Sequence, residues 1–313
     1  MAPNPVRPTT ITPDPPRSDV AETLAIIGCG YMGHSLLRGL LTATSRPQDR
    51  DAAKIIRFIA TTQRKKIAEM LEEQFNADRD RVIIYTSEHN LEAIRQAGTV
   101  ILACHPGDLD GILDTMGVRV ELSKKLVISL LQTRTAQEIV DALDNRVQNN
   151  SHGENLVPTV VRAAPNLAAA WASSMTIIEK REPLSEESLA MVTWIFKQVG
   201  QVHFLSGDAF CAGAMLASGG PAVMSAALSG MFDGCVAGGL TQLDSMVIAR
   251  QVLLGLAPTL TRPHHMIQLR ESAASCPNGP TIKTMNKLEK SGVRGLFADA
   301  MVEGIECVPS ERP

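Results

Sequence analysis

The chain has 313 residues, 44% of them hydrophobic and 20% charged, so it can bury a substantial core and suggests two domains. Its 30 basic and 33 acidic residues give a net charge of −3, which excludes the basic field that nucleic-acid-binding proteins carry. The six cysteines include no CxxC pair and no metal-ligand spacing, so we expect reduced thiols, a cytoplasmic protein and no metal site.

Residues 1–20 contain six prolines and lack the apolar run of a secretory signal. We therefore expect a disordered tail there. The longest candidate for a membrane span, residues 211–240, is interrupted by many glycines and a proline. We predict no membrane association from this composition.

The most informative motif is the glycine pattern Gly28-x-Gly30-x-x-Gly33, which follows an apolar run at residues 24–27 and opens a helical pattern. The first glycine permits a tight turn, the second lets the backbone approach a pyrophosphate, and the third lets the helix pack close to the strand. The alternative is a glycine turn without a ligand. We predict a dinucleotide site whose residues include Gly28, Gly30, Tyr31, Met32 and Gly33.

The second predicted strand, residues 54–60, leads into Thr61-Thr62-Gln63-Arg64-Lys65-Lys66. NAD-selective folds place a carboxylate near this point to bind the ribose hydroxyls, and none stands here. Hydroxyls and cations suit a 2′-phosphate, and Arg64 offers a bidentate contact. We predict NADPH as cofactor, held by Thr62 and Arg64, with NADH as the alternative. The competing interpretation is that these cations only solvate the first turn of the next helix.

Apolar strands then alternate with helical patterns as far as residue 205, which predicts an α/β fold with a doubly wound, mainly parallel Rossmann sheet over residues 21–205. Ligands of such sheets lie beyond the carboxyl ends of the strands. One cleft should therefore collect the turns at residues 28–33, 61–64, 104–106, 131–132 and 165–166. The predicted strands are residues 81–85, 99–104, 125–131, 159–163, 174–178 and 201–205, and the helices between them are residues 64–73, 90–96, 108–116, 135–143 and 185–199.

From residue 206 to residue 313 strand patterns vanish and an all-helical domain is predicted. Small residues are dense between residues 212 and 239. They suit either a tightly packed helical core or helices packed against a partner subunit, and the two are compatible. The predicted helices are residues 208–239, 242–260, 265–274 and 281–290, with a last one from residue 297.

Several motifs follow the glycine turn with Met32. They are Ala103-Cys104-His105-Pro106, Val161-Arg162-Ala163-Ala164-Pro165-Asn166, Ser218-Gly219-Gly220-Pro221-Ala222, and a final block made of residues 265–271, 276–282 and 288–295. Together these motifs make residues 24–306 resemble the pyrroline-5-carboxylate reductase family. The spacing within the final block is highly specific to that family.

The resemblance implies a Rossmann domain followed by a helical dimerisation domain, a homodimer or higher homo-oligomer, and reduction of a cyclic imine with NAD(P)H. It places Ala103, His105 and Pro106 at the cofactor and Asn166 beside the nicotinamide. It also places Thr281 at the substrate, so that Asn166 and Thr281 are the expected catalytic residues. The expected substrate-binding residues are Gly219, Cys276, Asn278, Gly279 and Thr281.

The substrate loop departs from the family pattern, because Cys276 stands for a serine, Asn278 for a glycine, and Pro280 precedes Thr281. Proline has no N–H and a thiol is a weak donor, so two donors to a substrate carboxylate are lost or weakened, each worth on the order of 1.5–3 kcal/mol. Three hypotheses remain: reduction of 1-pyrroline-5-carboxylate to proline in proline biosynthesis, reduction of another cyclic imine in specialised metabolism, or a catalytically idle NADP-binding protein.

Overall fold

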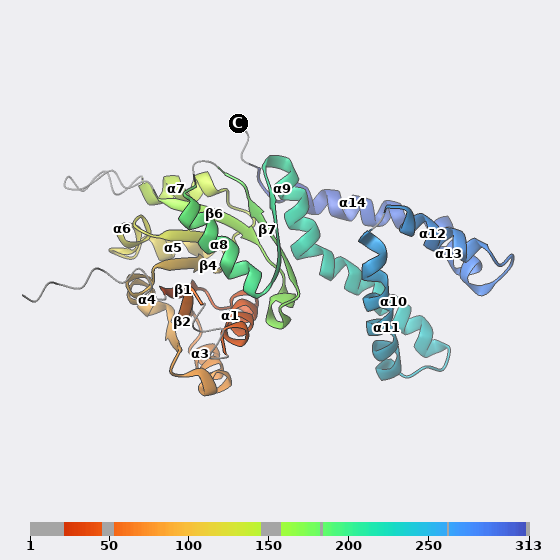
Figure 1. Ribbon diagram of the computed structural model, residues 1–313, viewed down its shortest axis with the longest axis horizontal. Helices are drawn as coiled ribbons and strands as arrows, with labels where there is room; N and C mark the ends of the chain where they lie inside the picture. Colours follow the sequence, from red (N-terminus) through yellow and green to blue (C-terminus); the bar gives the residue numbers. More distant parts are fainter. Residues whose placement is uncertain (1–21, 46–52, 145–157, 182–183, 262, 311–313) are drawn as a thin grey trace, which may run out of the picture.

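The computed structural model describes residues 22–45, 53–144, 158–181, 184–261 and 263–310. An α/β sandwich forms one half of the molecule, and an extended arm of helices forms the other (Figure 1). This architecture confirms the predicted fold class. The predicted tail, residues 1–20, lies outside the described residues, and the domain boundaries stay a prediction.

One eight-stranded sheet organises the first half, in the order β3-β2-β1-β4-β5-β6-β7-β8. All neighbouring strands are parallel except β6 and β7, which run antiparallel. The chain reverses its direction of winding between β1 and β4, which is where doubly wound sheets bind ligands. The strands are β1 (Glu22–Ile27), β2 (Ile55–Thr62), β3 (Val82–Thr86), β4 (Thr99–Leu102), β5 (Leu126–Ser129), β6 (Thr159–Ala164), β7 (Ser174–Glu179) and β8 (Gly200–Leu205).

Helices cover both faces of the sheet. One predicted helix, residues 108–116, is shorter than expected, because the chain turns at Gly117 in the left-handed conformation (φ 91°) and a separate helix α6 follows. Five residues are too few for a periodic pattern, so α6 was not predicted. The helices here are α1 (Tyr31–Ala43), α3 (Lys65–Gln74), α4 (Asn90–Gln96), α5 (Leu109–Leu113), α6 (Val118–Leu122), α7 (Ala136–Asp144) and α8 (Glu186–Gln198), with short turns η1 (Asn76–Asp78), η2 (Ser87–His89), η3 (Pro106–Asp108) and η4 (Leu167–Trp171).

Strand β1 shows how the two faces are filled. Its Leu24 and Ile26 pack with α1 and α8 on one face, while Ala25 and Ile27 pack with α4, α5, α6 and α7 on the other. All four side chains are fully buried. A strand covered on both sides must be apolar throughout, and this is why β1 reads as a continuous hydrophobic run.

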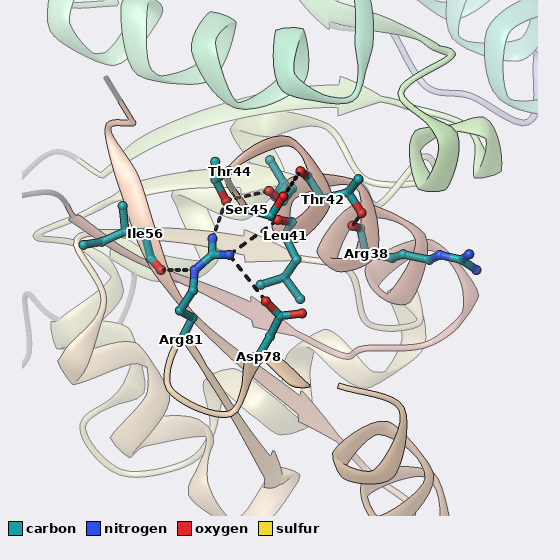
Figure 2. A network of polar contacts seen from close by, with 9 residues as sticks. Arg38, Leu41, Thr42, Thr44, Ser45, Ile56, Asp78 and Arg81 are labelled. Carbon is teal, nitrogen blue, oxygen red and sulfur yellow. Dashed lines mark hydrogen bonds and ion pairs between the residues drawn. The ribbon is translucent and has the colours of Figure 1, made fainter. Parts of the chain in front are cut away.

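A buried arginine holds the far end of α1 (Figure 2). The Arg81 guanidinium donates to the Thr44 hydroxyl and to the carbonyls of Leu41 and Ile56, and it pairs with Asp78 at 3.5 Å. The Arg81 side chain is only 5% exposed. One side chain therefore joins the end of α1 to β2 and to the turn before β3.

The arm is entirely helical. The predicted helix 208–239 is interrupted by a π-helical turn, η5, where the backbone widens between α9 and α10. The arm consists of α9 (Gly207–Ala214), η5 (Met215–Gly219), α10 (Gly220–Ala237), α11 (Gln242–Leu256), η6 (Ala257–Thr261), α12 (Pro263–Ala274), α13 (Pro280–Lys290) and α14 (Val293–Glu306).

Much of the arm is apolar and uncovered. By length and composition, the helical stretches 207–237 and 242–261 could each cross a membrane, although core helices of other proteins pass the same test. Such a large apolar surface marks an interaction site. Exposed side chains on α10 and α11 include Met224, Met231, Leu243, Val247, Ile248 and Leu254.

A second buried arginine ties the end of the arm back to the sheet. The Arg162 guanidinium, on β6, pairs with Glu179 at 3.2 Å and donates to the Pro309 carbonyl at 3.1 Å. It also lies over the Phe210 ring of α9, 4.6 Å from the centroid. The sheet therefore holds both the start of the arm and the segment that follows α14.

Candidate functional site

The turn between β1 and α1 has the shape that a dinucleotide requires. Gly28 adopts φ 88°, and a Cβ there would overlap the backbone of Cys104. A Cβ on Gly33 would lie 3.1 Å from Ile26 Cγ2, so Gly33 permits the close contact of α1 with β1. A Cβ on Gly30 would meet nothing within 4 Å. The open space is at the one glycine that was predicted to face the pyrophosphate.

The amino end of α1 offers hydrogen-bond donors to that space. Its first three N–H groups, those of Tyr31, Met32 and Gly33, have no acceptor inside the helix. No acidic residue stands in the first turn, so the positive end of the helix dipole is not neutralised there. The Cys29 N–H is already used, since it donates to the Thr61 carbonyl at 2.6 Å. This arrangement fits a pyrophosphate.

A cavity of about 730 Å³ opens beside the turn and is lined by the ends of β1 and β2 and by residues that follow β1, β2, β3 and β4. Four of the predicted cofactor residues, Met32, Gly33, Pro106 and Asn166, do not line it. The predicted residues that do are Gly28, Gly30, Tyr31, Thr62, Arg64, Ala103 and His105.

The end of β2 supplies the polar wall of the cavity. Thr62 is buried, and the exposed Arg64 is the residue before the first turn of α3. That first turn contains Lys65 and Lys66 and no acidic residue. A positive charge and a hydroxyl suit a 2′-phosphate, and the roles of Thr62 and Arg64 in holding it stay predictions.

The cavity is also lined by residues that were not predicted from the sequence. Asn90, at the start of α4, is 5% exposed, lines the cavity, and has no hydrogen-bond partner for its Oδ1 among the described residues. Ser87 and His34 line it as well, and His34 Nε2 lies 3.0 Å from Gln74 Oε1. Ser87 and Asn90 follow β3, so extending the sheet-edge argument to that strand would have found them.

Two thiols at the turn are held in their protonated form. Burial raises the pKa of Cys29 to about 12 and that of Cys104 to about 11. Neither is a thiolate near neutral pH, so neither acts as a nucleophile. Nearby, His105 Nδ1 accepts a hydrogen bond from the Gly107 N–H at 3.1 Å, so this ring nitrogen is occupied by the backbone.

Asn166 lies at the carboxyl end of β6, outside the cavity. Its Oδ1 accepts from the Ala168 N–H at 3.0 Å, which caps η4, and its Nδ2 donates to the Ala217 carbonyl at 2.9 Å. Its backbone N–H donates to Ser174 Oγ at 3.1 Å. The predicted contact with the nicotinamide stays a prediction.

The predicted substrate loop joins α12 to α13. Asn278 adopts a left-handed conformation (φ 62°), and the Gly279 N–H turns inward to the Cys276 carbonyl at 3.0 Å. Pro280 occupies the first helical position, where an N–H would lack an intrahelical partner in any case. At the start of α13, the donors left for an anion are the Thr281 hydroxyl and the N–H groups of Thr281 and Ile282.

The loop and the cavity lie at opposite ends of the molecule (Figure 1). Gly219, also predicted at the substrate, lies in η5 against the Met215 side chain. One chain therefore does not bring Cys276, Asn278, Gly279 and Thr281 to its own cofactor cavity. Their roles in substrate binding stay predictions.

Comparisons with known proteins bear on both halves. Residues 208–307 match the family profile described as pyrroline-5-carboxylate reductase dimerisation, and residues 23–133 match NADP oxidoreductase coenzyme F420-dependent. The chain is 34% identical over 292 residues to a pyrroline-5-carboxylate reductase of Lophium arboricola, with 90% of each chain covered. The chain belongs to the pyrroline-5-carboxylate reductase family.

Further members support this assignment. The reductase of Neurospora crassa is 30% identical over 309 residues, with 92% of each chain covered. The fold matches the crystal structure of Plasmodium falciparum pyrroline carboxylate reductase with NADP bound, at a TM-score of 0.71 and 18% identity, covering 91% of this chain and 96% of that one.

Membership in the pyrroline-5-carboxylate reductase family confirms the resemblance drawn from the sequence. The protein is an NAD(P)-dependent oxidoreductase of that family, with an NADP-binding domain and a dimerisation domain. The dimerisation match, residues 208–307, covers nearly all of both long apolar helical stretches of the arm, which suggests that their uncovered surface contacts a second subunit. The absence of membrane association stays a prediction.

Proposed function

We propose that this protein reduces 1-pyrroline-5-carboxylate to L-proline with NADPH, in the cytoplasm and as a homodimer or higher homo-oligomer. The observation that carries the proposal is the cavity at the glycine turn, with its open space at Gly30 and its cationic wall at Arg64. The same chain carries a helical domain that matches the family's dimerisation profile.

The chain's own residues then have distinct tasks. The first-turn amides of α1 hold the pyrophosphate, while Thr62 and Arg64 hold the 2′-phosphate. NADPH, when bound there, would supply the hydride for the imine carbon, and the proton on the imine nitrogen would come from water. The protein contributes positioning, because an iminium accepts hydride without an enzymic acid or base.

The substrate half of each site would come from the loop before α13. The Thr281 hydroxyl and the N–H groups of Thr281 and Ile282 can receive a carboxylate at the positive end of that helix. Because the loop and the cavity of one chain lie far apart, we infer that the loop of one subunit serves the cavity of its partner. Association through the apolar arm would then be necessary for activity.

The altered loop favours a second candidate, the reduction of another cyclic imine in specialised metabolism. Pro280 removes one N–H, and the exposed Cys276 thiol is a weaker donor than the family's serine. A substrate without a carboxylate, or with one held differently, would tolerate both changes.

The test is NADPH oxidation by the purified protein with 1-pyrroline-5-carboxylate and with matched cyclic imines that lack the carboxylate. Preferred turnover of 1-pyrroline-5-carboxylate supports the first candidate, and preferred turnover of another imine supports the second. NADPH binding without turnover of any imine would contradict both and favour an idle NADP-binding protein. The double variant Cys276→Ser with Pro280→Thr should raise turnover of 1-pyrroline-5-carboxylate if the loop is adapted to another substrate.

A further inference from the structure

The π-helical turn η5 leaves one backbone carbonyl without its normal helical partner. In an α-helix, the Ala217 carbonyl would accept from the N–H of the residue four positions on, which is Pro221. Proline has no N–H, and its ring crowds the carbonyl four residues before it. The helix widens into a π-turn at this place, and Ala217 itself is only 7% exposed. A buried carbonyl in this position needs another donor.

Asn166 is that donor. Its Nδ2 donates to the Ala217 carbonyl at 2.9 Å, across a separation of 51 residues. The other side-chain atom, Oδ1, caps η4 by accepting from the Ala168 N–H. One amide group therefore joins the first turn of η4 to the widened turn of the arm.

This connection runs from the helix α1, on the cofactor side, to the arm that carries the predicted substrate loop. On the cofactor side, η4 packs on α1 so closely that a Cβ on Gly39 would lie 2.1 Å from the Ala169 carbonyl oxygen. On the arm side, the Met215 side chain fills the space between Gly219 and Gly304, where added Cβ atoms would lie 2.4 and 2.7 Å from its Cε. The helix that begins at the dinucleotide turn is thus linked through Asn166 to α9, α10 and α14.

We propose that Asn166 is a positioning residue that sets the place of the arm relative to the cofactor helix α1, and hence the place of the loop that the arm presents to the cavity of the partner subunit. The expected change in the imine KM rests on the proposed reduction of a cyclic imine. The expected change in hydrogen exchange does not depend on that function. The geometry assigns the amide to the Ala217 carbonyl, where Asn166 supplies a donor that Pro221 lacks.

The variant Asn166→Asp separates the two bonds. A carboxylate keeps the oxygen that caps η4 but places an oxygen against the Ala217 carbonyl, so only the link to the arm is broken. We expect amide hydrogen exchange in residues 216–222 to become roughly tenfold faster or more. The KM for the imine should rise about tenfold or more, while the Kd for NADPH stays within about twofold.

Pro221→Ala is the second variant, and it tests the proposal even if Asn166→Asp does not fold. It restores an N–H for the Ala217 carbonyl, so the π-turn should close to an α-turn and release Asn166. We expect the same rise in imine KM with no loss of thermal stability. The matched control is Ser173→Ala, which removes the bond of Ser173 Oγ to the Trp171 carbonyl at the other end of η4 and should leave the imine KM unchanged.

Unchanged exchange in residues 216–222 of both variants would overturn the proposal. An equal rise in the Kd for NADPH and in the imine KM would also overturn it, because Asn166 would then bind the cofactor directly. If none of the imines tested supports NADPH oxidation by the parent protein, the proposed function is wrong, but the positioning role of Asn166 is not contradicted by that result. Faster exchange with intact NADPH binding in Asn166→Asp would still support the positioning role.

Discussion

A Cβ built on Gly28 would lie 2.4 Å from the Cα of Cys104, so the first glycine of the turn touches the backbone that follows β4. Gly28 also adopts φ 88°, a conformation that L side chains rarely adopt. The contact joins the two strands between which the sheet reverses its winding, and both residues line the cavity.

Gly28→Ala should therefore damage the fold as well as the site. The new methyl group overlaps backbone atoms that cannot rotate away, and the positive φ adds strain. We expect a loss of about 3 kcal/mol or more of stability, measured by thermal unfolding and by urea titration, together with loss of NADPH binding. A melting temperature equal to that of the parent would contradict this account of the turn.

Gly30→Ala is the matched variant, and we expect it to weaken NADPH binding without lowering stability. Gly30 has φ −82°, and its added Cβ meets no protein atom within 4 Å, so the melting temperature should not move. If the pyrophosphate occupies that space, the Kd for NADPH should rise about tenfold or more. Fluorescence titration of NADPH measures the effect, and an unchanged Kd would show that the phosphates do not bind at Gly30.

Arg64→Ala should change the choice of cofactor. A guanidinium that pairs with the 2′-phosphate contributes about 1.5–3 kcal/mol, equivalent to a rise of roughly 10- to 100-fold in the Kd for NADPH. NADH lacks that phosphate, so its Kd should stay within about twofold. Parallel titrations with both nucleotides decide the matter, and equal weakening of the two would show that Arg64 does not read the phosphate.

Arg81→Met should destabilise the nucleotide domain without touching the cavity. The methionine fills similar space but leaves the Thr44 hydroxyl, the Leu41 and Ile56 carbonyls and Asp78 without this donor. We expect a loss of about 3 kcal/mol, or roughly 6–12 °C in melting temperature. The neighbouring exposed Arg79 is the control, and Arg79→Met should change stability by about 0.5 kcal/mol or less.

The thiols of the buried Cys29 and the partly buried Cys104 should resist alkylation until the solution is strongly alkaline. With a pKa of about 11, Cys104 is about one part in a thousand thiolate at pH 8, and Cys29, at about 12, is lower still. The rate of iodoacetamide labelling should rise about tenfold per pH unit up to the pKa. Mass spectrometry of each peptide measures this, with the exposed Cys276 labelled at pH 8 as the internal reference. Rapid labelling of Cys104 at pH 8 would contradict the raised pKa of this partly buried thiol.

Strands β1 and β2 show how much of the fold and of the candidate site can be predicted from the sequence. Continuous apolar runs, the glycine spacing and the missing carboxylate after β2 are local patterns, and they predicted a Rossmann-type fold and an NADP-type site. The cavity contains Gly28, Thr62 and Arg64 as predicted, but it also contains Asn90. The sheet-edge argument was not applied to β3, where the residues lack a distinctive motif.

The sequence by itself determined the alternation of strands and helices, the glycine turn and the family, because backbone conformation and burial period depend on residues close together in the chain. Only the tertiary structure showed that Arg81 holds the end of α1, that Asn166 meets the Ala217 carbonyl, and that the loop before α13 lies far from the cavity. These relationships join residues tens of positions apart, and their partners are set by how the helices pack against the sheet.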